Sequence, residues 1–175
     1  MNTPDTKTLL IVWHSRTGAA LQMARAARRG AQAVAQELQA DIQAGPHLRI
    51  LFRAAARARP ADVLAADGIL FSAPENLAAL SGAMKEFFDR CYYPVLDRIN
   101  GRPYALMISA GSDGASAVRQ AERICTGWRL TSIAPALIVC THAQTPERIA
   151  APKRITADDR ARCETLGGTL AALLL

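Results

Sequence analysis

Segments typical of strands and segments typical of helices alternate along the whole chain, and this alternation limits the possible folds more than any other feature. Continuous apolar runs are typical of strands buried on both faces of a parallel sheet. Apolar residues three and four apart are typical of helices packed on such a sheet. The expected strands are 8–13, 47–52, 67–72, 103–109 and 136–140. The expected helices are 18–40, a helix from 81 that ends near Pro94, 115–125 and 156–174, the last weakened locally by Gly167 and Gly168.

This order predicts an α/β fold, a three-layer α/β/α sandwich with a five-stranded parallel sheet and right-handed crossovers. We expect residues 1–175 to form a single domain, because a chain of this length builds a full core without disulfides or a structural metal. Ligands of such sheets bind beyond the carboxyl ends of the strands. The site is therefore expected in the loops after the first, third and fourth strands.

The first of these loops, residues 14–20, contains the parts of a phosphate site. It leads into the N-terminus of a long helix, where free N–H groups and the helix dipole attract an anion. Ser15 and Thr17 add hydroxyl donors, and Gly18 lets the backbone approach a ligand closely. An ordinary capped turn remains an equal alternative on composition alone, because Ser and Thr cap helices routinely.

The second loop, residues 72–82, has a polar pair in small and apolar surroundings. Backbone N–H groups of residues 75–77 are suited to the heteroatoms of a flat ring. Asn76 offers both a donor and an acceptor, and Leu77 offers an apolar edge. Pro-Glu-Asn is also ordinary turn chemistry, so a plain turn stays open here.

The third loop, residues 109–115, contains Gly111 and Gly114, which permit close approach of the backbone to a ligand. Their spacing does not match the Gly-x-Gly-x-x-Gly dinucleotide fingerprint. A plain helix-capping loop, with Ser112 or Asp113 as the cap, is the alternative.

Taken together, the three loops resemble those of the flavodoxin-like fold, over essentially the whole chain. The closest similarity is to its branch of FMN-dependent NAD(P)H:quinone oxidoreductases and NADPH-dependent FMN reductases. Ser15-Arg16-Thr17-Gly18 is similar to the phosphate loop of that family. Pro74-Glu75-Asn76 through Gly82, followed by Met84-Lys85 and Phe88-Asp89, resembles the loop and helix beside the flavin ring. Ser109-Ala110-Gly111 stands where the third flavin-contacting loop begins.

The resemblance implies the strand order 2-1-3-4-5, FMN as cofactor and NAD(P)H as cosubstrate. It implies hydride transfer from NAD(P)H through FMN to a quinone or similar small acceptor. No side chain need be catalytic, since the flavin carries the chemistry, and no metal is expected. Backbone donors of the second loop would stabilise charge on the ring. The implied cofactor contacts are Ser15, Arg16, Thr17, Gly18, Ala19, Ala20, Pro74, Glu75, Asn76, Leu77, Ser109, Ala110, Gly111 and Gly114.

A flavodoxin-like protein that is not an enzyme is the first alternative, either an electron carrier or a partner-binding protein with weak or no FMN binding. Flavodoxin phosphate loops commonly continue with Asn-Thr, whereas this chain has Ala19 and Ala20 and so lacks one hydroxyl. Electron-carrier flavodoxins are also acidic and place aromatic residues around the ring. This chain is basic and has no aromatic residue in its second or third loop, which favours the enzyme branch.

Nucleic-acid binding is the second alternative, because the chain has 21 basic and 15 acidic residues and a net charge of +6. Charge alone gives only nonspecific, salt-dependent attraction, and no recognition motif accompanies it. We therefore expect no specific nucleic-acid partner and a solvated surface for most of these arginines. The residues concerned are Arg25, Arg28, Arg29, Arg53, Arg57 and Arg59.

The sequence also carries expectations about localisation, about the cysteines and histidines, and about an oligomer interface. The polar N-terminus and the short apolar run 9–13 predict a cytoplasmic protein without membrane insertion. The widely spaced Cys91, Cys125, Cys140 and Cys163 are expected to be reduced and mainly structural. The histidines are isolated, so each is expected at the surface, in a cap or in packing. Tyr92-Tyr93-Pro94 suits a homodimer or tetramer interface, a substrate wall or the core.

Overall fold

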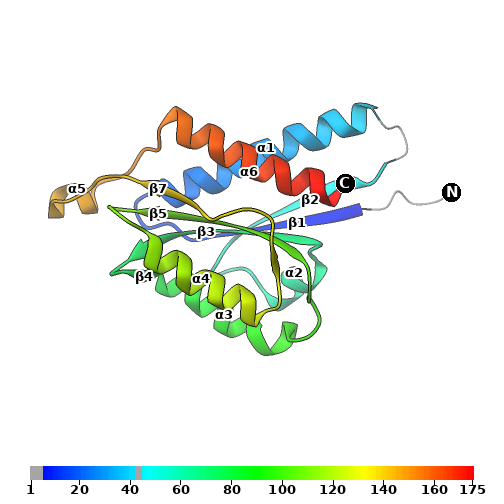
Figure 1. The fold of residues 1–175 in the computed structure, drawn as a ribbon, viewed down its shortest axis with the longest axis horizontal. Helices are drawn as coiled ribbons and strands as arrows, with labels where there is room; N and C mark the ends of the chain where they lie inside the picture. Colours follow the sequence, from blue (N-terminus) through cyan, green and yellow to red (C-terminus); the bar gives the residue numbers. More distant parts are fainter. Residues whose placement is uncertain (1–5, 42–44) are drawn as a thin grey trace.

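The computed structural model describes residues 6–41 and 45–175 and contains a sheet between two layers of helices (Figure 1). The strands are β1 Thr6–Trp13, β2 His47–Ala54, β3 Gly68–Asn76, β4 Ala79–Leu80, β5 Pro103–Ala110, β6 Thr131–Ser132 and β7 Leu137–Cys140. The helices are α1 Ala19–Asp41, α2 Pro60–Ala65, α3 Gly82–Val95, α4 Ala115–Gly127, α5 Pro146–Ala150 and α6 Ala157–Leu174.

The sheet has the expected flavodoxin-like order. Strands β2, β1, β3 and β5 are neighbours in that sequence, and both β6 and β7 pair with β5, all in parallel. With β7 as the fifth main strand, this order confirms the predicted α/β/α sandwich. The two-residue strand β4 is the exception, because it pairs antiparallel with the end of β3.

Two apolar clusters hold the layers to the sheet, one on each face. Leu9 and Ile11 of β1 pack with α1 and α6, while Leu10 and Val12 pack with α2, α3 and α4. Successive side chains of a strand point to opposite faces, so a strand covered on both faces must be apolar throughout. This explains the continuous apolar run that predicted β1.

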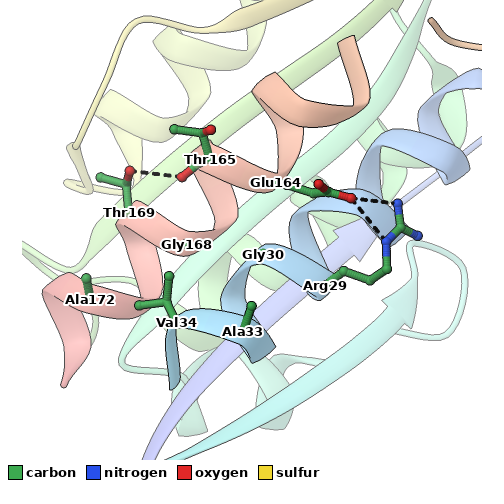
Figure 2. A pocket seen from close by; sticks show the side chains of 9 residues that line it. All are labelled: Arg29, Gly30, Ala33, Val34, Glu164, Thr165, Gly168, Thr169 and Ala172. Carbon is green, nitrogen blue, oxygen red and sulfur yellow. Dashed lines mark hydrogen bonds and ion pairs between the residues drawn. The ribbon is translucent and has the colours of Figure 1, made fainter. Parts of the chain in front are cut away.

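Helices α1 and α6 pack so closely that glycine is required at their contact. A Cβ atom on Gly30 would lie 1.9 Å from the carbonyl oxygen of Glu164, and one on Gly167 would lie 2.0 Å from that of Ala27. The glycine pair expected to weaken α6 therefore serves its packing. Figure 2 shows the outer side of this contact, a groove beside Gly30 and Gly168 that is bordered by the ion pair of Arg29 and Glu164, 3.0 Å apart.

Candidate functional site

A pocket of about 870 Å³ opens at the carboxyl ends of β1, β3 and β5, where the topology predicts a ligand site. All three loops singled out in the sequence line it, and so does a fourth segment. The lining residues are Arg16, Thr17 and Ala19; Pro74, Glu75, Asn76 and Leu77; Ser109, Ala110, Gly111 and Ser112; and Thr141, Ala143, Gln144, Ile149, Ala150 and Lys153.

The first loop presents the N-terminus of α1 to the pocket. Gly18 has a φ of +100°, and its N–H donates to the Ser15 hydroxyl over 3.1 Å. The first backbone hydrogen bond of α1 runs from the N–H of Gln22 to the carbonyl oxygen of Gly18, over 3.1 Å. The preceding N–H groups of the first turn therefore lack an intrahelical acceptor, and the positive end of the helix dipole lies among them.

Not every predicted residue of the first loop lines the pocket. Arg16, Thr17 and Ala19 do, and the Arg16 side chain is exposed, whereas Gly18 is not among the lining residues. Ser15 is not among the lining residues, and its hydroxyl accepts the turn bond from Gly18, as in the capped-turn alternative. Ala20 is buried, and its carbonyl accepts a hydrogen bond of 2.8 Å from the Ser72 hydroxyl. Among the residues of the first loop, the side-chain donors that line the pocket are therefore Arg16 and Thr17.

The second loop, residues 72–82, contains a β-hairpin, whereas the sequence predicted a loop there, with a plain turn as the alternative. Strand β3 continues to Asn76, which pairs with Ala79 of β4, and the turn consists of Leu77 and Ala78. Both turn residues have positive φ, +52° and +57°, and Leu77 is fully exposed at 102%. Such turns normally use Gly or Asn, because a Cβ disfavours this conformation. The hairpin thus holds an apolar side chain out in solvent at the pocket edge.

The third loop is tied to the second by a carboxylate. The Oε2 atom of Glu75 accepts a hydrogen bond of 3.0 Å from the N–H of Gly114, the residue that precedes α4. Gly114 has a φ of +80°, and a Cβ there would lie 2.9 Å from the side chain of Ile138. The N-cap of α4 is Gly114, so the alternative interpretation with Ser112 or Asp113 as the cap was wrong. Gly111 lines the pocket, whereas Gly114 is not among the lining residues.

Residues 141–153, which we call the fourth wall, were not expected at the site. Figure 1 shows α5, the helix of this wall, at the same end of the molecule as the hairpin of β3 and β4. Thr141 donates from its N–H (2.8 Å) and its hydroxyl (3.1 Å) to the carbonyl of Ala110, and Lys153 N–H donates to the carbonyl of Thr17 over 2.7 Å. The sequence does contain a signal for the start of this short helix: the N-cap residue Thr145, then Pro146, then an acidic residue in the first turn.

Two titratable groups near the loops have shifted pKa values. Burial, together with the positive charge of Arg16, lowers the pKa of His14. His14 Nδ1 lies 2.8 Å from the hydroxyl of Ser81, so this histidine joins β1 to the start of α3. Burial raises the pKa of the Cys140 thiol, and the carboxylates of Asp113 and Glu75 add to the effect. Both groups are therefore biased toward their neutral forms.

Other expectations concern metals, membranes and the arginines. Within residues 6–41 and 45–175, no group of three or more His, Cys, Asp or Glu could hold a metal ion. No helix in these same ranges is long and apolar enough to cross a membrane. Arg29 and Arg53 form ion pairs with Glu164 and Asp62, and the guanidinium of Arg28 lies 5.5 Å from the ring centroid of Phe52. The four cysteines are free thiols.

The pocket fits a flavin mononucleotide. Its α1 end offers helix N–H groups, the Thr17 hydroxyl and the Arg16 guanidinium, which are the donors that a phosphate requires. Its hairpin end offers the amide of Asn76 for the edge of a ring and the apolar side chain of Leu77 for contact with it. The fold and this pocket define a mononucleotide-binding protein of the flavodoxin-like class.

Comparison with known proteins gives the family. The family model described as NADPH-dependent FMN reductase matches residues 14–144, and the chain belongs to this family. This confirms the predicted cofactors, FMN and NAD(P)H. A curated relative, NAD(P)H dehydrogenase (quinone) of Acidithiobacillus ferrooxidans, is 32% identical over 92 residues. That match spans 47% of this chain and 46%, or about half, of the relative.

Solved structures with low sequence identity share the fold. A flavodoxin from the domain Archaea is 15% identical with a TM-score of 0.70, over 95% of this chain and 98% of the other. A flavodoxin, WrbA-like protein from Agrobacterium tumefaciens is also 15% identical, with a TM-score of 0.69, over 97% and 98% of the two chains. The flavodiiron protein of Giardia intestinalis is 12% identical with a TM-score of 0.71, over 97% of this chain but 36% of its own.

Proposed function

We propose that this protein transfers electrons from NAD(P)H through FMN to a quinone or a similar small, flat acceptor. The observation that carries the proposal is the convergence of three loops on one pocket of about 870 Å³, with anion donors at one end and a polar hairpin with an apolar tip at the other. Sites for small cofactors commonly have this size. The name of the curated relative, NAD(P)H dehydrogenase (quinone), supports a quinone as the acceptor.

In this proposal the phosphate of FMN binds at the start of α1. The N–H groups of the first turn, the Thr17 hydroxyl and the Arg16 guanidinium donate to its oxygens. The turn requires a φ of +100° at Gly18, a conformation that glycine adopts readily because it has no Cβ. Ser15 supports the turn through its bond to the Gly18 N–H.

The ring of FMN lies against the hairpin and the third loop in this proposal. The side-chain amide of Asn76 and the N–H groups of Glu75 and Leu77 would meet polar ring atoms, and Leu77 would exclude water from one edge. Glu75 keeps the hairpin and the third loop in register through its bond to Gly114. Residues Ser109, Ala110 and Gly111 form the remaining ring contact.

FMN held by these residues would supply the redox chemistry that passes two electrons from NAD(P)H to the acceptor. In sum, NAD(P)H, a quinone and one solvent proton give NAD(P)⁺ and the hydroquinone. The chain contributes binding, orientation and exclusion of water. We propose residues 1–175 as a single flavodoxin-like domain that contains this whole site.

Anaerobic rapid mixing of the FMN-loaded protein tests the proposal. We expect NADH or NADPH to bleach the visible flavin absorbance, and a quinone such as menadione, added next, to restore it. A protein that binds FMN but is bleached by neither nicotinamide would support the non-catalytic alternative. If NAD(P)H bleached the flavin but quinones did not reoxidise it, the protein would be an oxidoreductase whose acceptor is not a quinone.

A further inference from the structure

Gln22 joins two parts of the pocket that are far apart in the sequence. Its Nε2 donates to the carbonyl oxygens of Gly18, at 3.0 Å, and of Lys153, at 2.7 Å. Its Oε1 accepts a hydrogen bond of 3.3 Å from the N–H of Ile155. Lys153 in turn donates from its N–H to the carbonyl of Thr17. A single side chain of α1 thus connects the phosphate loop with the end of the fourth wall.

Hydrogen bonds from side chains to backbone carbonyls hold the fourth wall in position. No residue of α5 is buried, so the helix lacks an apolar anchor in the core. Its last carbonyls are capped by the Lys153 ammonium, which donates to Arg148, to Ile149 at 2.9 Å and to Ala151 at 2.6 Å. Orphan carbonyls at a helix end need such partners. Lys153 thereby orients α5, and Gln22 fixes the backbone of Lys153.

The part of α5 that reaches the pocket is apolar. Ile149 lines the pocket although its side chain is 55% exposed. Leu77, on the hairpin, is the other large exposed hydrophobic residue among those that line it. Burying such side chains against a ligand is favourable in proportion to the area removed from water. A flat, apolar molecule that enters the mouth of the pocket would gain from this contact.

We propose that Gln22 is a positioning residue: it fixes the fourth wall to the phosphate loop and so holds Ile149 where it contacts a flat, apolar electron acceptor. The acceptor contact rests on the proposed function, whereas the attachment of the wall does not. Gln22 itself touches neither the acceptor nor the reacting atoms.

Three variants and a matched control separate the parts of this proposal. Gln22→Glu keeps the size of the side chain but replaces the donor that serves two carbonyls with an oxygen. Lys153→Met removes the cap of α5 and leaves the backbone bonds of residue 153 in place. Ile149→Ala removes only the apolar contact. Gln39→Ala is the control, because Gln39 lies in the same helix and bonds to His47, outside the pocket.

Amide hydrogen exchange of the protein without FMN tests the attachment. In Gln22→Glu the carboxylate oxygens repel the carbonyl oxygens of Gly18 and Lys153, so we expect the N–H group of Lys153 to exchange about tenfold faster than in the unmodified protein. Gln39→Ala should leave this exchange unchanged. Lys153→Met should speed exchange at Ile149 and Ala151 while Ile155 stays protected. Unchanged exchange at Lys153 in Gln22→Glu would overturn the positioning role.

Steady-state kinetics of the FMN-loaded protein test the acceptor contact. We expect Gln22→Glu and Ile149→Ala to raise the KM for menadione about fivefold. The KM for ferricyanide should change less, because this small and hydrophilic acceptor gains nothing from an apolar contact. An unchanged KM for menadione in both variants would overturn the acceptor contact. If no variant turned over quinones, this contact and the proposed function would fall together, while hydrogen exchange would still decide the role of Gln22.

Discussion

The carboxylate of Glu75 accepts a hydrogen bond from the backbone N–H of Gly114, with Oε2 3.0 Å from N. This bond connects the end of β3 with the start of α4, two of the three loops that line the pocket. The N-terminus of a helix also favours a nearby negative charge. Glu75 therefore connects the hairpin to the third loop at this end of the pocket, a role that its prediction as a cofactor contact did not include.

Replacing Glu75 by Gln should weaken FMN binding about tenfold, because the bond to Gly114 loses its charge. Quenching of FMN fluorescence on titration with the protein measures the dissociation constant. Glu86→Gln is the control, since Glu86 pairs with Arg90 on the surface of α3. Equal affinities for Glu75→Gln and Glu86→Gln would show that the bond to Gly114 does not shape the site.

Loss of the Thr17 hydroxyl should weaken FMN binding by about 1.5 to 3 kcal/mol, the range for a hydrogen bond to a charged group. Riboflavin has no phosphate, so its affinity should not change in Thr17→Ala. Thr17→Ser retains the hydroxyl and should bind FMN nearly as well as the unmodified protein. Parallel titrations with FMN and riboflavin check this, and a similar loss for both ligands would contradict a phosphate contact at Thr17.

Gly167→Ala should destabilise the fold by about 1 to 3 kcal/mol through overpacking. The added Cβ would lie 2.0 Å from the carbonyl oxygen of Ala27, so α1 and α6 would have to separate. Gly127→Ala, in α4, has no atom within 4 Å of the new Cβ and should be neutral or slightly stabilising. Urea unfolding of both variants provides the comparison. Similar midpoints would rule out the close contact of the two helices.

The thiols should differ in reactivity toward an alkylating reagent. Cys91, Cys125 and Cys163 are buried, and burial raises the pKa of Cys91 to about 11 and that of Cys163 to about 12. The thiolate is the reactive form, so partly exposed Cys140 should be alkylated first. Mass spectrometry of the native protein after brief alkylation identifies the labelled residue. Early labelling of Cys91 would contradict the burial of this thiol beneath α3.

The raised pKa of the Cys91 thiol also predicts that the stability of the fold depends on pH. Because the folded-state pKa of Cys91 is about 11 against an ordinary value of 9.0, its neutral form is favoured on folding. This contribution is complete below the ordinary pKa and is lost as pH rises toward the folded-state value. The free energy of unfolding should therefore fall less steeply between these two pH values in Cys91→Ala than in the unmodified protein. Equal slopes would contradict the shift.

The sequence predicted the fold and the three loops because both follow from local patterns. Apolar runs and helical spacing indicate the layers, and parallel topology brings the loops after β1, β3 and β5 to one edge. The Leu77-Ala78 turn was not predictable in this way, since positive φ in Leu and Ala opposes their own preferences and is held by the β3–β4 pairing.

The fourth wall escaped sequence analysis for a different reason. Helix α5 is only five residues long, too short to show helical periodicity. Its attachment through Gln22 joins residues that are 131 positions apart, which no local pattern reports. The role of Gly114 was likewise hidden, because its N–H bonds to Glu75, a residue of another loop.

Titration of the purified protein with FMN, followed by flavin fluorescence and the visible spectrum, measures whether the pocket binds a flavin mononucleotide. The geometry of the pocket predicts saturable binding of one FMN per chain at micromolar concentration or below, and weaker binding of riboflavin. No change in fluorescence or spectrum at micromolar FMN would contradict the account.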